Sequence, residues 1–268
     1  MSSEPRVNIR LGERRRRRRR LAYILLGIFI LACVIASVWG TWQSAVRVQS
    51  VDVRGGDSAL SAYAESALLG TYVRIIPHNS IFFFPERAIR SSILADHPDI
   101  AAISISRAGL TTIVITVVPR VALGRWCGLA PTAGVEEYCY LFDASGFIFA
   151  PTTASSTVIN TFTTYVPLAT DTEEPLRATL AHAELLPSVF DFARQFSSRI
   201  IPVRSVMLVG DEVRFRLASG ARLMYVLGSE RQAFQAIISA EETTDFADET
   251  IDYIDLRFEG KVYLKRKE

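Results

Sequence analysis

The sequence predicts an α+β protein carried on a single N-terminal transmembrane helix. Three observations lead to this prediction: an uncharged apolar stretch near the N-terminus, a following segment in which strands and helices alternate, and a long remainder of short strands separated by turns. Of the 268 residues, 49% are hydrophobic and 22% charged, which excludes a disordered chain and allows a sizeable core. We expect a basic arm (1–20), a transmembrane helix (21–46), a β-α-α-β-β domain (47–119) and a β-rich domain with accessory helices (120–268).

The first element is the membrane span, residues 21–46, which contain no Asp, Glu, Lys or Arg. As a helix this stretch reaches about 39 Å, enough to cross a hydrocarbon core of about 30 Å. Trp39 and Trp42, near its end, suit the headgroup layer. Seven consecutive arginines precede the span: Arg14, Arg15, Arg16, Arg17, Arg18, Arg19 and Arg20. Because such charge is retained in the cytoplasm, we expect a single-pass protein of the cytoplasmic membrane with its C-terminal body outside.

Three other interpretations of this region remain open. A cleaved signal peptide would use small residues such as Ala36, although the apolar run continues well past that position. A lipoprotein would be modified at Cys33, although Leu31 fits the lipidation motif poorly and thirteen uncharged residues follow. The arginine run could instead neutralise nucleic-acid phosphates. The run lies directly before the membrane span, where anionic lipid headgroups can bind its charge, so we expect no nucleic-acid partner.

Residues 47–119 read as a compact two-layer unit. A valine-rich strand stops at Gly55, an apolar-periodic helix follows Asp57, and a second helix begins at Pro85 and ends before Pro98. Two alternating strands then form a hairpin. The expected elements are a strand at 47–54, helices at 57–70 and 85–98, and strands at 103–106 and 113–117. Together they predict a three-stranded sheet with two helices on one face.

Beyond residue 120 the chain changes to short strands with glycine-containing turns. The expected strands are Tyr138–Phe142, Phe147–Phe149, Val203–Val209, Glu212–Leu217, Arg222–Val226, Ile254–Arg257 and Lys261–Lys265. One helix is expected within 176–196, broken or started at Pro187, and another from Ser229 to about Glu241. The Thr/Ser-rich segment 151–164 has no periodicity and reads as an exposed loop.

The sequence gives little support to catalysis. His78, His97 and His182 lie far apart, and none belongs to a metal-binding spacing. Phosphate-binding and serine-hydrolase motifs are also missing from the sequence. We therefore expect no enzyme activity, no catalytic residues, no metal, no cofactor and no small-molecule substrate.

Cys127 and Cys139 both fall on the outer side of the membrane in the expected topology, where disulfides persist. We expect them to pair, which would stabilise the fold by roughly 3 kcal/mol in the chain-entropy model. The alternative is a pair of buried thiols.

Four motifs give the chain a resemblance to the FtsQ/DivIB family of bacterial cell division proteins. Val51 to Gly55 resembles the opening strand of that family's POTRA domain, and His97 to Ile100 its passage from second helix to strand. Tyr140 to Asp143 with Gly146 is similar to an L-x-D-x-x-G hairpin, and Ile254 to Phe258 to a closing D-L-R-aromatic strand. Residues 119–122 depart from the family pattern and keep only its arginine, Arg120.

The resemblance implies a non-enzymatic, septum-enriched scaffold of the divisome with a POTRA-like first domain. Its partners would be FtsB/DivIC-like and FtsL-like single-pass division proteins, besides the lipid bilayer. The implied partner-binding residues lie at the last strand, whose edge could accept a partner strand: Arg257, Phe258, Gly260, Val262 and Tyr263. The alternative is an envelope-assembly or export factor whose POTRA-like unit handles polypeptides, because fold alone does not separate these functions.

Overall fold

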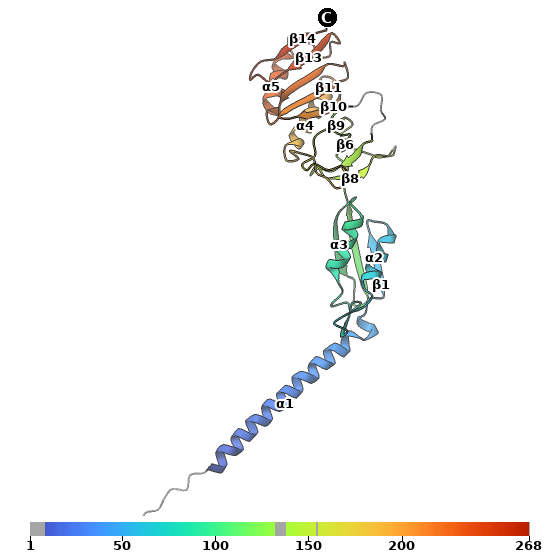
Figure 1. The fold of residues 1–268 in the computed structure, drawn as a ribbon, viewed down its shortest axis with the longest axis vertical. Helices are drawn as coiled ribbons and strands as arrows, with labels where there is room; N and C mark the ends of the chain where they lie inside the picture. The colour runs from blue at the N-terminus through green and yellow to red at the C-terminus, as the bar shows by residue number, and fades with distance from the viewer. Residues whose placement is uncertain (1–8, 132–137, 154, 268) are drawn as a thin grey trace, which may run out of the picture. The chain divides into compact units, whose positions relative to one another are not determined.

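The structure is a computed structural model that describes residues 9–131, 138–153 and 155–267. The chain divides into two compact units, Met1–Val118 and Pro119–Glu268. Their division lies next to the boundary expected at 119–120. Figure 1 shows the mixed composition: a long helix and a small α/β body in the first unit, and a β-rich body in the second.

The long helix α1 spans Ile9–Thr41 and includes a stretch, Arg16–Thr41, that is long and apolar enough to cross a membrane. The large apolar side chains from Leu21 to Ile35 are more than half exposed, so the protein itself offers them no cover. The helix ends earlier than the expected span of 21–46. Beyond Thr41 the backbone turns away, and the indole N–H of Trp42 donates to the carbonyl of Ile75 at 2.8 Å.

The body of the first unit contains the expected order of a strand, two helices and two strands, with an additional short hairpin between the helices. The elements after the short turn η1 (Ser44–Val46) are β1 (Ser50–Arg54), η2 (Ser58–Leu60), α2 (Ser61–Ala67), β2 (Thr71–Tyr72), β3 (Ile76–Pro77), α3 (Glu86–Asp96), β4 (Ile100–Arg107) and β5 (Thr112–Pro119). The first expected helix is shorter than 57–70 and begins in a 3-10 turn, which the side chain of Asp57 caps at the N–H of Ala59.

The three longer strands form a sheet in the order β1-β5-β4, with β1 parallel to β5. Leu60, Ile89 and Ile93 from the helical layer pack with Ile113 and Ile115 of β5 in one buried cluster. The alternating pattern of apolar residues in β5 therefore places them against α2 and α3, as the sequence predicts.

The second unit is built around a nine-stranded sheet and two helices. Its elements are β6 (Gly124–Trp126), β7 (Tyr140–Phe142), β8 (Ile148–Pro151), β9 (Thr163–Tyr165), α4 (Leu186–Arg199), β10 (Val203–Val209), β11 (Glu212–Leu217), β12 (Arg222–Val226), α5 (Glu230–Ala240), β13 (Ile251–Asp255) and β14 (Tyr263–Arg266). The strand order is β14-β13-β12-β11-β10-β9-β6-β7-β8, which leaves β14 and β8 at the two edges.

The core of this unit lies between one face of the sheet and the two helices. In β11, Val213, Phe215 and Leu217 are buried, whereas Arg214 and Arg216 between them are exposed. Phe192 of α4 packs against Phe215, with ring centroids 5.3 Å apart. Pro187 occupies the first turn of α4, where its missing N–H breaks no helical hydrogen bond, so the prediction that a helix starts there is confirmed.

Two short strands in this sheet were not expected. β6 and β9 each have three residues and no alternation long enough to detect, yet they pair with each other and join the two halves of the sheet. The expectation of an exposed loop over 151–164 is wrong at its end. Asn160 and Phe162 are buried, and the side chain of Asn160 accepts a hydrogen bond from Arg194 of α4 at 2.7 Å.

The last hairpin is shifted from its expected position. We expected strands at 254–257 and 261–265, but the structure has β13 at Ile251–Asp255 and β14 at Tyr263–Arg266. The cause is Asp255, whose carboxylate accepts the backbone N–H of Arg257 at 3.0 Å and starts a turn there. Of the expected partner-binding residues, only Tyr263 therefore lies in a strand. Arg257, Phe258, Gly260 and Val262 lie in the connection that precedes it.

The structure joins Cys127 and Cys139 by a disulfide, with their Cα atoms 4.3 Å apart. The bond ties the residue after β6 to the residue before β7, so it closes the connection between two paired strands. Residues 132–137 of that connection lie outside the described residues. Cys33 of α1 is a free, exposed cysteine.

Candidate functional site

The candidate site consists of the edge strand β14 (Figure 1) and the connection that leads into it, which carries four of the five expected partner-binding residues. It pairs with β13 on one side only, in antiparallel register from Asp255 opposite Tyr263 to Ile251 opposite Arg266. All four of its residues are exposed. Successive residues of a strand face opposite sides of the sheet, so neither face of β14 is covered. Among the described residues no strand pairs with its outer edge, whose backbone groups are then a template for a further strand.

A buried carboxylate holds the connection that leads into β14. Asp255 is 5% exposed and accepts Nε and Nη2 of Arg257 at 2.9 and 2.6 Å. The third guanidinium nitrogen of Arg257 donates to Glu212 of β11 at 2.6 Å. Glu212 also pairs with Arg214. This network connects the turn to a neighbouring part of the sheet, so the turn has a defined position although it carries no regular structure.

The same network shifts two pKa values. Hydrogen bonds from the side chain of Arg257 are the largest cause of a lowered pKa for Asp255, and they outweigh the raising effect of burial. The pKa of Arg257 is raised, chiefly by its hydrogen bonds to Asp255. Both groups are therefore charged across the physiological range, and the pair is a permanent structural link.

The turn displays two aromatic rings. Phe258 and Tyr263 stack edge to face, with ring centroids 5.2 Å apart, and both remain about half exposed. Between them the N–H of Lys261 donates to the carbonyl of Phe258 at 3.1 Å, and Gly260 adopts a φ of 67°, which a side chain would strain. Val262 is partly buried against the core of the unit. The result is an exposed aromatic pair at the start of an open strand.

Two cavities separate this turn from the helix α5. One, of about 250 Å³, lies between Phe258 and residues that include Gln232 and Ala236. The other, of about 590 Å³, extends along Ala236 and Ser239 to Leu264 of β14. Residues 232, 236 and 239 are one helical turn apart and share one side of α5. This side of α5, together with the turn and β14, forms a groove that we call the α5 groove.

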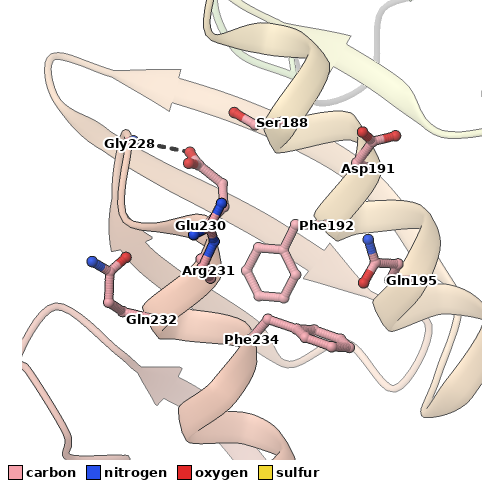
Figure 2. Close-up of a pocket in the computed structure, with 9 residues that line it drawn as sticks. All are labelled: Ser188, Asp191, Phe192, Gln195, Gly228, Glu230, Arg231, Gln232 and Phe234. Atoms are coloured by element: carbon pink, nitrogen blue, oxygen red, sulfur yellow. Dashed lines mark hydrogen bonds between the residues drawn. The ribbon is translucent and has the colours of Figure 1, made fainter.

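A third hollow lies at the other side of α5, against α4 (Figure 2). Its volume is about 450 Å³, and its lining includes the rings of Phe192 and Phe234, whose centroids are 5.9 Å apart. Glu230 projects beside them and accepts the N–H of Gly228 at 2.9 Å. Gln232 lines this hollow as well as both cavities of the α5 groove. The helix α5 thus forms a wall of all three.

The sequence identified one wall of this site and missed the other. The residues from Arg257 to Tyr263 do come together, but the α5 residues facing them were not expected. Their signal is weak, because Gln232, Ala236 and Ser239 are small or polar and look like an ordinary solvated helix face. Glu212, which binds Arg257 across two strands, gave no signal in the sequence either.

Two of the three histidines have separate local partners in the part of the chain that the structure describes. His78 contacts the carbonyl of Leu69 through Nδ1, and His97 lies 3.8 Å from Asp99, so these rings have separate local partners. Within the described ranges, no group of three or more His, Cys, Asp and Glu residues is arranged to hold a metal ion.

The L-x-D-x-x-G segment forms a structural turn. Asp143 accepts the N–H groups of Ser145 and Phe147 and pairs with Arg120. Burial raises its pKa, but hydrogen bonds from Ser145 and Arg120 more than offset this and the pKa lies below its ordinary value. The guanidinium of Arg120 also lies 4.2 Å from the ring centre of Phe147. These contacts account for Arg120 and Asp143 without a ligand.

Comparison with known proteins gives no assignment. No model of a protein family matches the chain, and no curated protein matches it at a significant level.

Proposed function

We propose that the chain is a non-enzymatic, single-pass membrane scaffold of the bacterial divisome, similar to the FtsQ/DivIB family. In this proposal the outer edge of β14 and the α5 groove hold an extended segment of an FtsB/DivIC-like partner, with an FtsL-like protein in the same assembly. The single observation that carries the proposal is the open edge of β14 beside an exposed aromatic pair and a groove.

Strand addition fits this geometry. The backbone of an incoming strand would bond to the free edge of β14 and supply affinity without regard to its sequence. Phe258 and Tyr263 are exposed aromatic residues, a type that dominates the energetics of protein interfaces. The two cavities of the α5 groove would accept side chains from one face of the added strand, which would supply specificity.

The charge of β14 restricts which strand can pair there. Tyr263 and Leu264 at its start are apolar, whereas Lys265 and Arg266 at its end are basic. Basic residues at an edge protect it from indiscriminate pairing. Arg266 is already bound to Asp248, with Nη1 and Oδ2 2.7 Å apart. We therefore propose a partner strand with apolar residues opposite Tyr263 and Leu264 and an acidic residue opposite Lys265.

The membrane part of the proposal rests on α1 and its flanking charges. The helix is long and apolar enough to span a bilayer, and its arginines at residues 16–20 are exposed. Retention of these charges in the cytoplasm would place the part of the first unit that follows α1, and the whole second unit, on the opposite side of the membrane. A bitopic partner would then meet the second unit in the same compartment.

The test combines localisation with capture of the partner. A fluorescent fusion of the full chain is expected to form a band at the division septum of growing cells. Phe258→Glu should weaken copurification of the FtsB/DivIC-like partner by about 30-fold, corresponding to roughly 2 kcal/mol for one buried aromatic contact. The matched control is Ile159→Glu, an apolar residue of the same unit with 58% exposure against 54% for Phe258. The control should bind normally.

Two results would contradict the proposal. A uniform envelope distribution of the fusion would favour an export or envelope-assembly factor instead. Normal capture by a folded Phe258→Glu protein, with capture lost after changes in the first unit, would move the partner site away from β14. Equal thermal transitions of the two variants establish that a difference in capture does not come from misfolding.

A further inference from the structure

The hairpin β2–β3 of the first unit carries exposed apolar residues in an unfavourable backbone conformation. Its turn has Val73 and Arg74 at φ values of 49° and 61°, closed by a hydrogen bond of 2.9 Å from the N–H of Ile75 to the carbonyl of Tyr72. Two successive positive φ values are typical of a type I′ turn, which favours Asn and Gly at these positions. A β-branched valine with positive φ is a backbone outlier.

The strained valine is not used to fill the core. Val73 is 88% exposed, and Ile75 and Leu69 beside the hairpin are also exposed by half or more. Strained residues of this kind cluster at functional sites, so an exposed strained valine is a candidate for a function. The hairpin therefore projects apolar side chains into its surroundings at the expense of local stability.

A hydrogen bond fixes the hairpin to the end of the membrane-spanning helix. The indole of Trp42, the residue that follows α1, donates to the carbonyl of Ile75 at 2.8 Å. The guanidinium of Arg47 stacks 5.1 Å from the centre of the same indole. Tryptophan at the end of a span lies in the headgroup layer, which is about 5 to 7 Å thick on each side of the hydrocarbon. Val73 is two residues from Ile75, so their Cα atoms are at most about 7 Å apart. This distance is comparable to the thickness of the headgroup layer.

A second exposed apolar segment lies on the same side of the unit. The N–H of Ile81 donates to the carbonyl of Val46 at 2.9 Å, so the residues after Ile81 begin close to the chain that leaves α1. Phe82 and Phe83 follow and are about half exposed. Between Glu65 and Glu86 the sequence has no acidic residue, and between Glu13 and Asp52 it has none either. This side of the unit is apolar and basic.

We infer that the β2–β3 hairpin and Phe82–Phe83 insert into the headgroup layer of the bilayer that holds α1, and so dock the first unit on the membrane surface. The occupant is a phospholipid interface, in which Val73 and Ile75 contact the upper acyl chains and Arg74 contacts lipid phosphate. The inference rests on the anchoring of α1 in the proposed function, and not on partner binding at β14.

The test uses the full chain with Cys33→Ser, reconstituted in vesicles of phosphatidylcholine and phosphatidylglycerol with a nitroxide on a fraction of the lipid headgroups. A bimane label is attached through Val73→Cys or, as the matched control, Val118→Cys. Val118 is an exposed valine of the same unit near the far end of β5, whose first residue, Thr112, pairs with Ser50 close to the anchor. Six residues of strand place Val118 about 20 Å from Thr112 along β5.

We expect the label at Val73 to be quenched about five-fold more than the label at Val118, because only the former lies inside the layer that holds the nitroxide. A second arm labels Ile75→Cys and adds Val73→Asn with Arg74→Gly, which builds a preferred type I′ turn without the apolar tip. This change should raise the thermal transition of the chain and lower quenching at Ile75 about two-fold, because the hairpin loses a membrane contact.

Flotation of the vesicles separates the two possible failures. If the chain floats with the vesicles and the labels at Val73 and Val118 are quenched equally, the docking inference is wrong while the anchor stands. Unchanged quenching at Ile75 in the Asn-Gly protein would likewise overturn it, because the strained turn would then have no role at the membrane. If the chain does not float, the membrane anchor of the proposed function fails and the docking inference fails with it.

Discussion

Replacing Arg257 with alanine tests whether the link between Asp255 and Arg257 holds the turn before β14. The change removes two hydrogen bonds to a carboxylate that is 5% exposed and one to Glu212. Charge-assisted bonds are worth about 1.5 to 3 kcal/mol each. Because the side chain of Arg257 is 40% exposed and water replaces part of what is lost, we expect the unfolding free energy of the second unit to fall by about 2 kcal/mol.

The effect should depend on pH in a defined direction. The pKa of Asp255 is lowered in the folded protein, so its stabilising contribution is fully present above the unfolded value of about 3.9. It is lost as the pH falls through the lower folded pKa, where the carboxylate becomes protonated. The difference between the native protein and Arg257→Ala should therefore be constant from about pH 5 to 8 and shrink below about pH 4.

Urea unfolding of the full chain in detergent micelles, followed by the fluorescence of the buried Trp126, measures this difference. The control is Arg222→Ala, which breaks a more exposed pair with Asp252 and should change the unfolding free energy by less than about 0.5 kcal/mol. A loss in Arg257→Ala no larger than in this control would refute the reasoning, as would a loss that stays the same in acid.

Three further changes have defined outcomes. Reduction of the bond between Cys127 and Cys139 should lower the unfolding free energy of the second unit by about 3 kcal/mol. If both thiols can be alkylated in protein that was isolated from its own compartment and denatured without a reductant, the bond does not form. The double change Val73→Asn and Arg74→Gly should raise the unfolding free energy of the first unit by about 1 to 2 kcal/mol in detergent. A lower thermal transition temperature of the double variant would contradict the strain assigned to this turn. Phe192→Ala, at a ring 5.1 Å from that of Tyr225, should cost about 3 to 5 kcal/mol by calorimetry; a loss under 1 kcal/mol would show that the cavity collapses.

The elements that the sequence predicted well have strong local signals. The helix α4 begins at a proline in its first turn and carries Phe192 and Phe196 one helical turn apart. The strands β10, β11 and β12 are five to seven residues long and alternate clearly. The apolar stretch also has a strong local signal, because an uncharged run of that length is rare in a soluble fold, and the structure has a helix there that is long and apolar enough to cross a membrane.

The elements that were missed lack such signals for identifiable reasons. β6 and β9 have three residues each, too few for a period to be seen, and they exist only because neighbouring strands pair with them. The hairpin β2–β3 has Val73 and Arg74 where a turn of its type favours Asn and Gly. Local sequence rules fail at Val73 because the residue is strained, and such failures mark candidate functional positions.

The candidate site was predictable only in part for a similar reason. The D-L-R-F segment was visible as a motif, but its conformation depends on Asp255 capturing Arg257 and on Glu212, 45 residues earlier in the chain. The other wall of the groove is one side of α5. Its position opposite the turn depends on how α5 packs on the sheet, which no local sequence pattern around Gln232 or Ala236 indicates. A local capture of Arg257 by Asp255 therefore shifted the start of β14, whereas contacts between residues distant in sequence decided the shape of the groove.

The most direct measurement of the central claim is site-specific photocrosslinking in growing cells, with benzoylphenylalanine at Leu264 of β14. A matched position is Val209 of β10, which is similarly exposed but lies in the interior of the sheet order, away from the open edge. A partner strand on β14 predicts a crosslink from Leu264 to a small single-pass division protein and none from Val209. Crosslinking from Val209 without any from Leu264, in a protein that supports growth, would contradict a partner site at the edge of β14.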